Sequence, residues 1–236
     1  MKKLMAILVS ALLVLSLAAC GNSNQDAVDN TPAESETPAT QPSDTSTEGT
    51  ESAKAGNGNT LIAYFSVMET DGVDTVAGAS RVAVNGETLG NNQYIAQIIQ
   101  QETGGDLFAI ETVQDYPTTH DPLLEFAYQE KAENTRPELA TQIEHPENYD
   151  VIFLGYPNWN ADLPMPLYTF LEEYDFSGKT IIPFTSHGGS GFSRTIQTIS
   201  ELQPGATVVT DGLSISRNSV ADAQNEVVNW VNRLQD

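Results

Sequence analysis

Residues 170–192 read FLEEYDFSGKTIIPFTSHGGSGF, and this stretch decides the fold class. At its centre, an apolar run at 180–185 predicts a buried strand, and a glycine-rich turn follows it directly. Amphipathic stretches at 164–174 and 193–202 lie before and after this strand and predict helices. A strand flanked by two helices is the repeating unit of an α/β sheet.

The same alternation extends from this unit toward both ends of the chain. Further strands are predicted at 60–66, 106–112, 151–156 and 207–209, and further helices at 92–103, 122–134 and 219–234. The run 151–154 is apolar on both faces, as a parallel sheet covered by helices on both sides requires. We therefore expect a doubly wound α/β fold with five strands. Ser219 is placed to cap the last helix, and a long non-periodic insertion, 67–89, interrupts the first strand-to-helix connection.

Residues 1–20 predict a secretory signal peptide. Lys2 and Lys3 precede an apolar run that is shorter than the ~20 residues needed to span a bilayer. The stretch 17–21, Leu-Ala-Ala-Cys-Gly, is similar to the lipobox of bacterial lipoproteins, and its Cys20 is the one cysteine of the chain. We expect Cys20 to be lipidated and to hold the protein on the extracytoplasmic face of a bacterial cell membrane.

Residues 21–59 predict a disordered acidic tether. They are rich in Ser, Thr and Pro, lack aromatic residues, and hold one aliphatic residue larger than alanine, Val28. The domain at 60–236 retains 25 acidic and 7 basic residues, a net charge of −18. A surface this acidic repels nucleic acid and anionic lipid, so the lipid anchor is the one membrane contact that we expect.

Ligands of open parallel sheets bind outside the carboxyl ends of the strands, and three such ends are unusual in this sequence. The first strand ends at Ser66, and after the insertion the chain enters a helix through Gly90, Asn91 and Asn92. A hydroxyl beside the unpaired N–H groups of a helix start suits a phosphate. An Asn that simply caps the helix explains this segment equally well.

Two further strand ends carry candidate ligand contacts. The third predicted strand is followed by Pro157, Asn158, Trp159 and Asn160. We expect Trp159 to be exposed and to stack on a planar ring, the alternative being an indole folded back onto the domain. The fourth strand leads into Thr185, Ser186, His187, Gly188, Gly189, Ser190 and Gly191. A glycine-rich backbone of this kind can offer several N–H donors to one edge of a ligand.

Several other chemistries do not fit these residues. The nucleophile elbow of hydrolases fails, because the fifth residue counted from Gly188 is Phe192 rather than glycine. No dinucleotide-binding or P-loop glycine pattern follows a strand. The three histidines, His120, His145 and His187, share no metal-ligand spacing, and one cysteine forms neither a disulfide nor a cysteine-ligated metal site.

At these residues the chain resembles the flavodoxin family, and in particular the flavodoxin-like proteins common in anaerobic bacteria. The matching stretches are 61–66, 90–92, 156–159 and 170–192, and the likeness extends over 60–236. The resemblance implies a five-stranded parallel sheet in the order 2-1-3-4-5 and FMN as the cofactor.

The resemblance also implies a role for each candidate residue. Ser66 and residues 90–92 would hold the FMN phosphate, residues 157–160 would flank one side of the isoalloxazine ring, and residues 185–191 would line the other side and the pyrimidine edge. Phe192 would be a packing residue. The family's phosphate loop ends in Gly-Asn-Thr close behind the first strand. Here 23 residues split that loop and its last position is Asn92, so one hydroxyl contact is lost.

The expected function is FMN-dependent electron transfer by a membrane-anchored protein. Its acidic surface would steer a basic redox protein, and a small-molecule acceptor is the other expected partner. Two alternatives remain open, an FMN-dependent NAD(P)H or quinone reductase and a non-catalytic surface module that has lost FMN.

Overall fold

A computed structural model describes residues 59–70 and 81–235. The chain separates into two units, Met1–Glu48 and Gly49–Asp236, and every described residue belongs to the second. The predicted signal peptide, the predicted lipidation site Cys20 and all but the last residue of the predicted tether lie outside the described residues. So does the part of the predicted insertion at 71–80.

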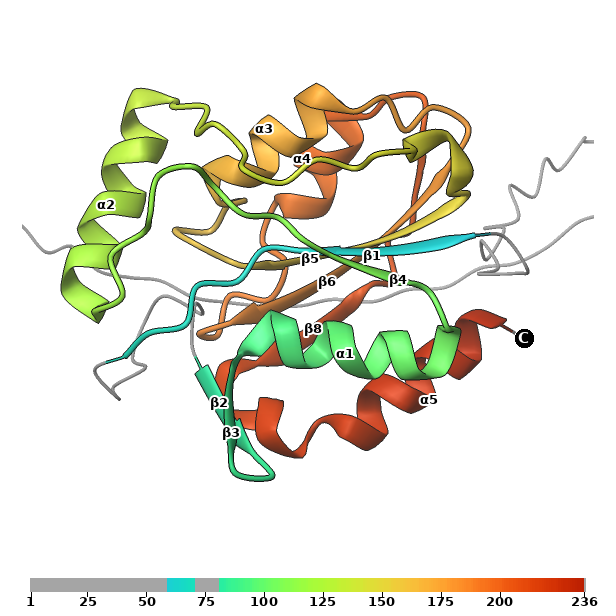
Figure 1. Ribbon diagram of the computed structural model, residues 1–236, viewed down its shortest axis with the longest axis horizontal. Helices are drawn as coiled ribbons and strands as arrows, with labels where there is room; N and C mark the ends of the chain where they lie inside the picture. Colours follow the sequence, from blue (N-terminus) through green and yellow to red (C-terminus); the bar gives the residue numbers. More distant parts are fainter. Residues whose placement is uncertain (1–58, 71–80, 236) are drawn as a thin grey trace, which may run out of the picture. The chain divides into compact units, whose positions relative to one another are not determined.

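A parallel sheet forms the centre of the domain (Figure 1). Its strands are β1 (Thr60–Tyr64), β4 (Asp106–Ala109), β5 (Val151–Pro157), β6 (Thr180–His187), β7 (Thr207–Val208) and β8 (Leu213–Ser216). They lie in the order β4-β1-β5-β6, and both β7 and β8 pair with β6. This arrangement confirms the expected α/β fold and its strand order, with β7 and β8 sharing the fifth position.

The fifth position of the sheet differs from the prediction in one respect. β7 pairs with Thr180 and Ile181 at the start of β6, whereas β8 pairs with the last four residues of that strand. The sequence prediction found β7 but missed β8. The reason is that β8 reads Leu-Ser-Ile-Ser, with only alternate residues buried, whereas the other central strands are nearly continuous apolar runs.

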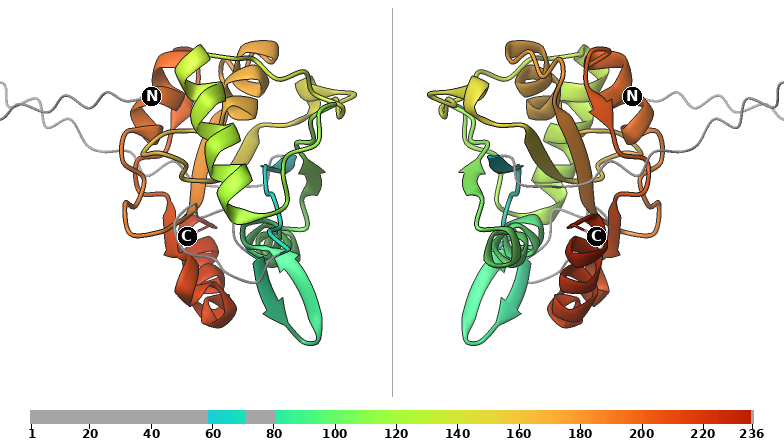
Figure 2. Two further views of the ribbon diagram at one scale, coloured as in Figure 1. Left: turned by 90° about the vertical axis from the view of Figure 1, so that its left-hand side faces the viewer. Right: turned by 90° about the vertical axis from the view of Figure 1, so that its right-hand side faces the viewer.

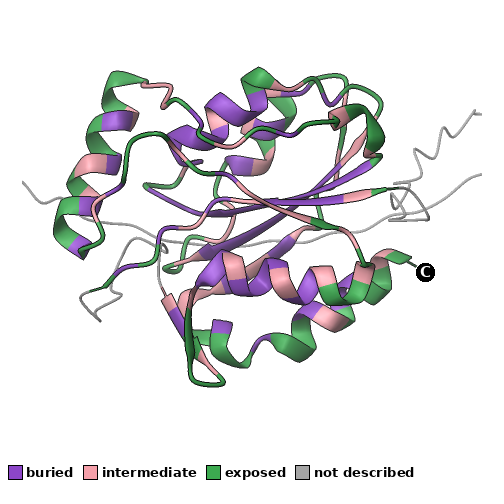
Figure 3. Ribbon diagram, in the orientation of Figure 1, coloured by how far each residue is buried: buried purple, intermediate pink, exposed green. Residues whose placement is uncertain are grey.

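Five α-helices cover the two faces of the sheet (Figure 1). They are α1 (Asn91–Thr103), α2 (His120–Glu133), α3 (Met165–Glu173), α4 (Thr195–Leu202) and α5 (Gln224–Gln235), with short 3-10 helices η1 (Pro146–Asn148) and η2 (Arg217–Asp222). α1 and α5 pack on one face and α2, α3 and α4 lie on the other, so each face has its own apolar core. All seven residues of β5 are buried between these layers, and Figure 3 shows burial concentrated on the strands and on the inner sides of the helices.

The last helix begins later than predicted. α5 starts at Gln224, and the segment that contains Ser219 forms η2 instead, so the prediction that Ser219 caps the helix is wrong. Val220 and Ala223 are nevertheless buried together with Val227. Residues three positions apart share a face in a 3-10 helix as well as in an α-helix, so the apolar pattern did not distinguish the two.

The described end of the insertion is a β-hairpin, which the sequence prediction missed. β2 (Arg81–Val84) and β3 (Glu87–Gly90) pair in antiparallel fashion, and Figure 2 shows the hairpin projecting beside α1. Its turn residues, Asn85 and Gly86, have φ angles of 54° and 84°, as the Asn-Gly turn of a two-residue hairpin requires. The hairpin returns the chain to Gly90, where α1 begins.

Candidate functional site

The structure brings together the two halves of the predicted phosphate loop. Ser66 follows β1, and Gly90 lies directly before α1, with 23 residues between them in sequence. A Cβ atom placed on Gly90 would lie 2.1 Å from the Ser66 Oγ atom, so only glycine allows this approach. The insertion is therefore looped out, and the hydroxyl and the helix start lie side by side.

The start of α1 offers donors to an anion. The first N–H groups of an α-helix have no partner within the helix and lie at its positive end. The first turn of α1 contains no acidic residue, and the Gln93 side chain accepts a hydrogen bond from the Gly90 N–H at 3.2 Å. Asn91 and Asn92 open the helix, and each is only 1% exposed.

A buried hydrogen bond joins this helix start to the end of β6. Asn92 Nδ2 donates to Ser186 Oγ at 3.0 Å, and both side chains are buried. Asn92 stands where the family resemblance implies a threonine. The longer amide side chain therefore links two predicted parts of the site.

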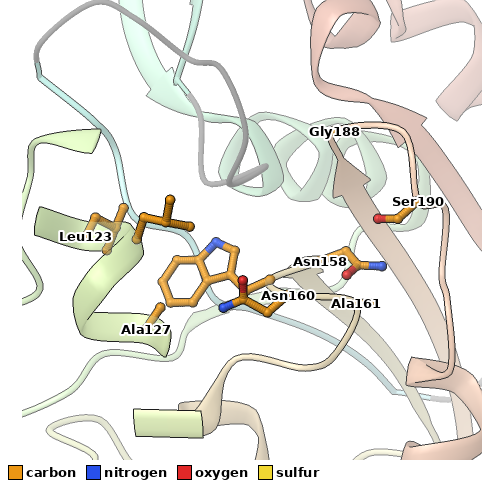
Figure 4. A pocket seen from close by; sticks show the side chains of 9 residues that line it. Leu123, Ala127, Asn158, Asn160, Ala161, Gly188 and Ser190 are labelled. Carbon is orange, nitrogen blue, oxygen red and sulfur yellow. The ribbon is translucent and has the colours of Figure 1, made fainter. Parts of the chain in front are cut away.

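A cavity of about 200 Å³ lies between α2 and the loops that follow β5 and β6. Leu123, Leu124 and Ala127 of α2 line one side, the segment 158–161 after β5 lines another, and Gly188 and Ser190 line the loop after β6 (Figure 4). Five predicted site residues, Asn158, Trp159, Asn160, Gly188 and Ser190, thus meet at one cavity. Its volume is below the ~300 Å³ of a whole-ligand pocket, which suits a ring system rather than a complete nucleotide. We call it the ring cavity.

A tight turn shapes the floor of the ring cavity. Trp159 and Asp162 exchange backbone hydrogen bonds of 3.1 and 2.9 Å, and the two residues between them, Asn160 and Ala161, have φ angles of 52° and 59°. Two successive residues in the left-handed region characterise a type I′ turn. An alanine there is strained, because its Cβ disfavours that conformation by roughly 1–2 kcal/mol. Lys131 Nζ stabilises the turn by donating to the Asn160 carbonyl at 2.8 Å.

Trp159 is buried, so the expectation of an exposed indole is wrong. It is 4% exposed and lies 5.5 Å from the Phe65 ring and 5.7 Å from the Tyr116 ring, between centroids. The tight turn folds the side chain back into this aromatic cluster. Trp159 still lines the ring cavity, but as part of its wall rather than as a free stacking surface.

Asn158 connects the two loops that border the ring cavity. Its Nδ2 donates to the Gly191 carbonyl at 2.6 Å and to Ser193 Oγ at 3.1 Å, and its backbone N–H donates to the Ser186 carbonyl at 2.9 Å. Asn158 is 4% exposed. The loop after β5 and the loop after β6 are therefore fixed relative to each other.

His187 has a defined tautomer at the start of the second loop. Its Nδ1 accepts a hydrogen bond from the Gly189 N–H at 2.9 Å, so Nε2 carries the proton when the ring is neutral. Partial burial lowers the pKa of His187 below its ordinary value. Near pH 7 the side chain is thus a neutral donor through Nε2. Gly189 and Gly191 have φ angles of 130° and 57°, which favour glycine.

Three other predicted residues lie deeper in the sheet. Pro157 ends β5 opposite Ser186, and Thr185 is fully buried. The Thr185 hydroxyl donates to the Tyr156 carbonyl at 2.7 Å and so links the two strands. The predicted ligand contacts of Pro157, Thr185 and Ser186 stay predictions. Phe192 packs against the core, as expected.

Two parts of the site were missed from the sequence. One is the inner face of α2, whose Leu123 and Ala127 are buried and line the ring cavity. The other is Tyr116, which donates to Glu130 Oε2 at 2.6 Å and packs against Trp159. Burial raises the pKa of the Glu130 carboxyl. The amphipathic pattern of α2 was visible, but nothing in it marked the face as part of a site.

Several buried polar atoms of this edge have no hydrogen-bond partner among residues 59–70 and 81–235. They are Asn91 Nδ2 and Oδ1, Asn92 Oδ1, Asn158 Oδ1 and Trp159 Nε1. Buried amide groups almost always have partners, because an unpaired one costs about 1–3 kcal/mol. These atoms lie at the carboxyl ends of the strands, and a polar ligand bound there would supply their missing hydrogen bonds.

Residues 59–70 and 81–235 lack two further kinds of feature, a metal site and a membrane-spanning helix. This part of the chain contains no group of acidic, histidine or cysteine side chains arranged to hold a metal ion. None of its helices combines the length and apolar character that crossing a membrane demands.

Comparisons with known proteins bear on the family and the fold of the chain. The sequence model of the flavodoxin family matches residues 82–234. A Bacteroides eggerthii protein assigned as a flavoprotein is 21% identical, with a TM-score of 0.52, and the match covers 76% of this chain and 99% of that one. The Lactobacillus acidophilus flavoprotein solved in complex with FMN is 20% identical, with a TM-score of 0.48, over 72% of this chain and 99% of that one. No curated protein matches the chain.

The family match and the fold support the same assignment. The matched residues make up well over half of the chain and include β4, β5, β6, the helices α1 to α4 and all but the last residue of α5. The structure adds β1 and Ser66, which lie before the matched region but join its sheet and its site. This chain therefore belongs to the flavodoxin family.

Proposed function

We propose that the domain binds FMN and transfers electrons, and that a lipid on Cys20 holds it on the extracytoplasmic face of a bacterial cell membrane. Membership of the flavodoxin family supports the cofactor. The observation that carries the proposal is the group of buried, unpartnered polar atoms on Asn91, Asn92, Asn158 and Trp159 at the carboxyl ends of the strands. They include donors and acceptors, as the mixed polar surface of FMN needs.

The phosphate would be held at the start of α1. The Ser66 hydroxyl and the first N–H groups of that helix would supply donors, and the first turn contains no acidic residue. Glu111, which follows β4, also lines the hollow beside Ser66 and Gly90. The amides of Asn91 and Asn92 lie next along the chain and suit polar groups between the phosphate and the ring. Asn92 remains oriented by Ser186 while its Oδ1 stays available.

The isoalloxazine ring would occupy the ring cavity. Leu123, Ala127 and Trp159 give that cavity an apolar wall that excludes water, and Asn158 holds its two loops together. His187 would present a neutral N–H donor to the edge of the ring. When bound, FMN supplies the redox chemistry, which no side chain of the site provides.

The charge of the domain bears on the reduction potential of a bound flavin and on the kind of redox partner. A net charge of −18 disfavours the addition of further negative charge in the site and so lowers the reduction potential, whereas backbone donors after β6 act in the opposite direction. The same charge supports a basic redox protein as the partner, because opposite charges speed diffusional encounter.

The membrane anchor rests on the sequence alone. The lipobox-like stretch at 17–21 supports lipidation of Cys20, and the polar composition of residues 21–59 supports a tether that separates the domain from the membrane. Labelling of cells with a radioactive or clickable palmitate tests this, with Cys20→Ala as the control. Equal label on both forms would exclude lipidation at Cys20.

A reductase is the second candidate. A separate groove of about 420 Å³ lies beside the ring cavity, and a reductase needs room for its substrate next to the flavin. The purified chain would then oxidise NAD(P)H with a quinone over many turnovers, without a partner protein. A carrier would show no such turnover.

The first experiment is a visible absorption spectrum of the full-length chain in a non-ionic detergent. FMN is added, unbound flavin is removed on a desalting column, and the spectrum is recorded again. Retained flavin at one equivalent with a perturbed spectrum is the expected result. Variant Asn91→Leu should retain less flavin, because it removes both unpartnered amide atoms. A colourless wild-type chain would overturn the proposal and favour a surface module that has lost FMN.

A further inference from the structure

A second cavity, which we call the groove, adjoins the ring cavity. Its volume is about 420 Å³, and it lies between the ends of α2 and α4, beside Tyr168 of α3. Asn160 and Ala161 line both cavities, so the two cavities meet at the tight turn. A molecule that contacts a ring held in one cavity can therefore extend into the other.

The side chains that line the groove carry two positive and two negative charges, Lys131 and Arg194 against Asp162 and Glu201, although the domain as a whole is strongly acidic. Three of the seven basic residues within 60–236 are Lys131, Arg136 and Arg194. Lys131 and Arg194 line the groove, and Arg136 lies 4.9 Å above the ring of Tyr168, which also lines it. Because the domain has 25 acidic and 7 basic residues, a groove with a random selection of them would be acidic.

The acidic groups of the groove already have partners. Asp162 accepts from the Tyr168 hydroxyl at 3.0 Å and pairs with Lys131 at 3.1 Å. Glu201 accepts from Gln197 at 2.8 Å. By contrast, Arg194 is exposed and makes no side-chain hydrogen bond or ion pair with the rest of the described chain. Its five N–H donors remain available for a bidentate contact with a carboxylate or phosphate.

We infer that the groove binds the anionic group of a small redox substrate whose planar part lies against the ring in the ring cavity. Arg194 makes the main contact and the hydroxyl of Thr198 lies on the same wall, whereas Lys131 is held by its ion pair with Asp162. This inference rests on the proposed FMN site. It names the class of small-molecule partner, a planar compound that carries a carboxylate or a phosphate.

Isothermal titration calorimetry on the FMN-loaded full-length chain tests the inference. Anthraquinone-2-carboxylate and NADP⁺ serve as the carboxylate and phosphate probes, and uncharged 2-methyl-1,4-naphthoquinone is the neutral control. Arg194→Gln should weaken binding of the anionic probe by about tenfold, the value of one charge-assisted hydrogen bond, and should leave the neutral quinone unchanged. The probe that binds the wild type more tightly identifies the anionic group.

Arg233→Gln is the matched control variant. Arg233 is also exposed, but it lies on α5, on the other face of the sheet, and removing it changes the net charge by the same amount. It should leave all affinities unchanged. Equal binding by wild type and Arg194→Gln, equal losses in Arg194→Gln and Arg233→Gln, or no binding of either anionic probe would each overturn the inference.

Failure of the FMN site is separable from failure of the groove. Retention of FMN on the desalting column reports on the proposed function alone. If FMN is not retained, the FMN-free chain is titrated with inorganic pyrophosphate instead. A tenfold difference between wild type and Arg194→Gln then supports the groove as an anion site, and equal affinities overturn it.

Discussion

Ser66 and Ser190 test the two ends of the candidate site at the scale of single residues. Ser66 lies against Gly90 at the helix start, and Ser190 lines the ring cavity. We expect Ser66→Ala to weaken FMN binding by about tenfold and to leave riboflavin binding nearly unchanged, because only FMN carries the phosphate. Ser190→Ala should affect both flavins alike. Fluorescence titration of each flavin measures this, and equal losses in Ser66→Ala would exclude Ser66 from phosphate binding.

The burial of Trp159 changes what its replacement should do. Trp159→Ala removes a ring that packs against Phe65 and Tyr116, so we expect the free energy of unfolding to fall by about 3–5 kcal/mol. Trp159→Phe keeps an aromatic ring and removes an unpartnered indole N–H, so it should cost less than about 1.5 kcal/mol. Urea unfolding of both variants provides the measurement. A stable Trp159→Ala variant would contradict the packing role.

His187 gives the domain a pH-dependent contribution to stability. Its folded pKa is lowered by burial, whereas in the unfolded chain it titrates near 6.5. Between those two values the unfolded state binds more protons, so stability falls as pH falls below 6.5 and is fully present above it. We expect the drop in urea midpoint from pH 7.5 to 5.5 to be smaller in His187→Gln than in the wild type. A drop in His187→Gln as large as that of the wild type would contradict this contribution.

At the scale of secondary-structure elements, the elements that sequence predicts well are those buried on both sides. β5 is an unbroken apolar run with every residue buried, so its pattern and its environment agree. β8 and the hairpin β2–β3 are short and partly exposed, and their pairing depends on contacts that a local pattern does not contain. The one local signal for the hairpin is the Asn85-Gly86 pair, which is typical of a two-residue turn.

The candidate site was predictable to a similar degree. Its polar residues lie after strands that the sequence revealed, because ligand contacts of an open sheet gather at the strand ends. The link from Asn92 to Ser186 spans 94 residues, and the turn that buries Trp159 depends on two non-glycine residues in the left-handed region. Neither feature follows from local sequence, since both depend on tertiary packing.

The conformation of the β2–β3 hairpin should affect FMN binding. Gly86 has a φ angle of 84°, so Gly86→Ala should cost about 1 kcal/mol of stability and weaken FMN binding, because β3 delivers Gly90 to Ser66. Gly178 has a φ angle of 76° in a turn at the amino end of β6, away from the site. Gly178→Ala should therefore lose similar stability with unchanged FMN binding. Thermal unfolding and flavin titration of both variants separate the two effects.

At the scale of the whole domain, the fold determines the geometry of the site, whereas the net charge acts on the approach of other molecules. The two helix layers pack on the sheet and fix the positions of the strand ends, and hence of the site. The net charge of −18 instead sets how partners approach, because the field of a whole domain reaches beyond contact distance. The groove beside Arg194 is a local exception to that field. A small anionic molecule can thus be held at a surface that repels anions elsewhere.

The long-range field predicts how electron transfer depends on salt. The full-length chain, loaded with FMN and reduced, is mixed with a basic haem protein in a stopped-flow spectrometer. Between 0.01 and 0.15 M ionic strength the Debye length falls from ~30 to ~8 Å, so the bimolecular rate constant should fall by about tenfold or more. An uncharged quinone should accept electrons at a rate that does not change with salt. A flat response with the basic protein would show that encounter is not electrostatically steered, because screening then removes nothing.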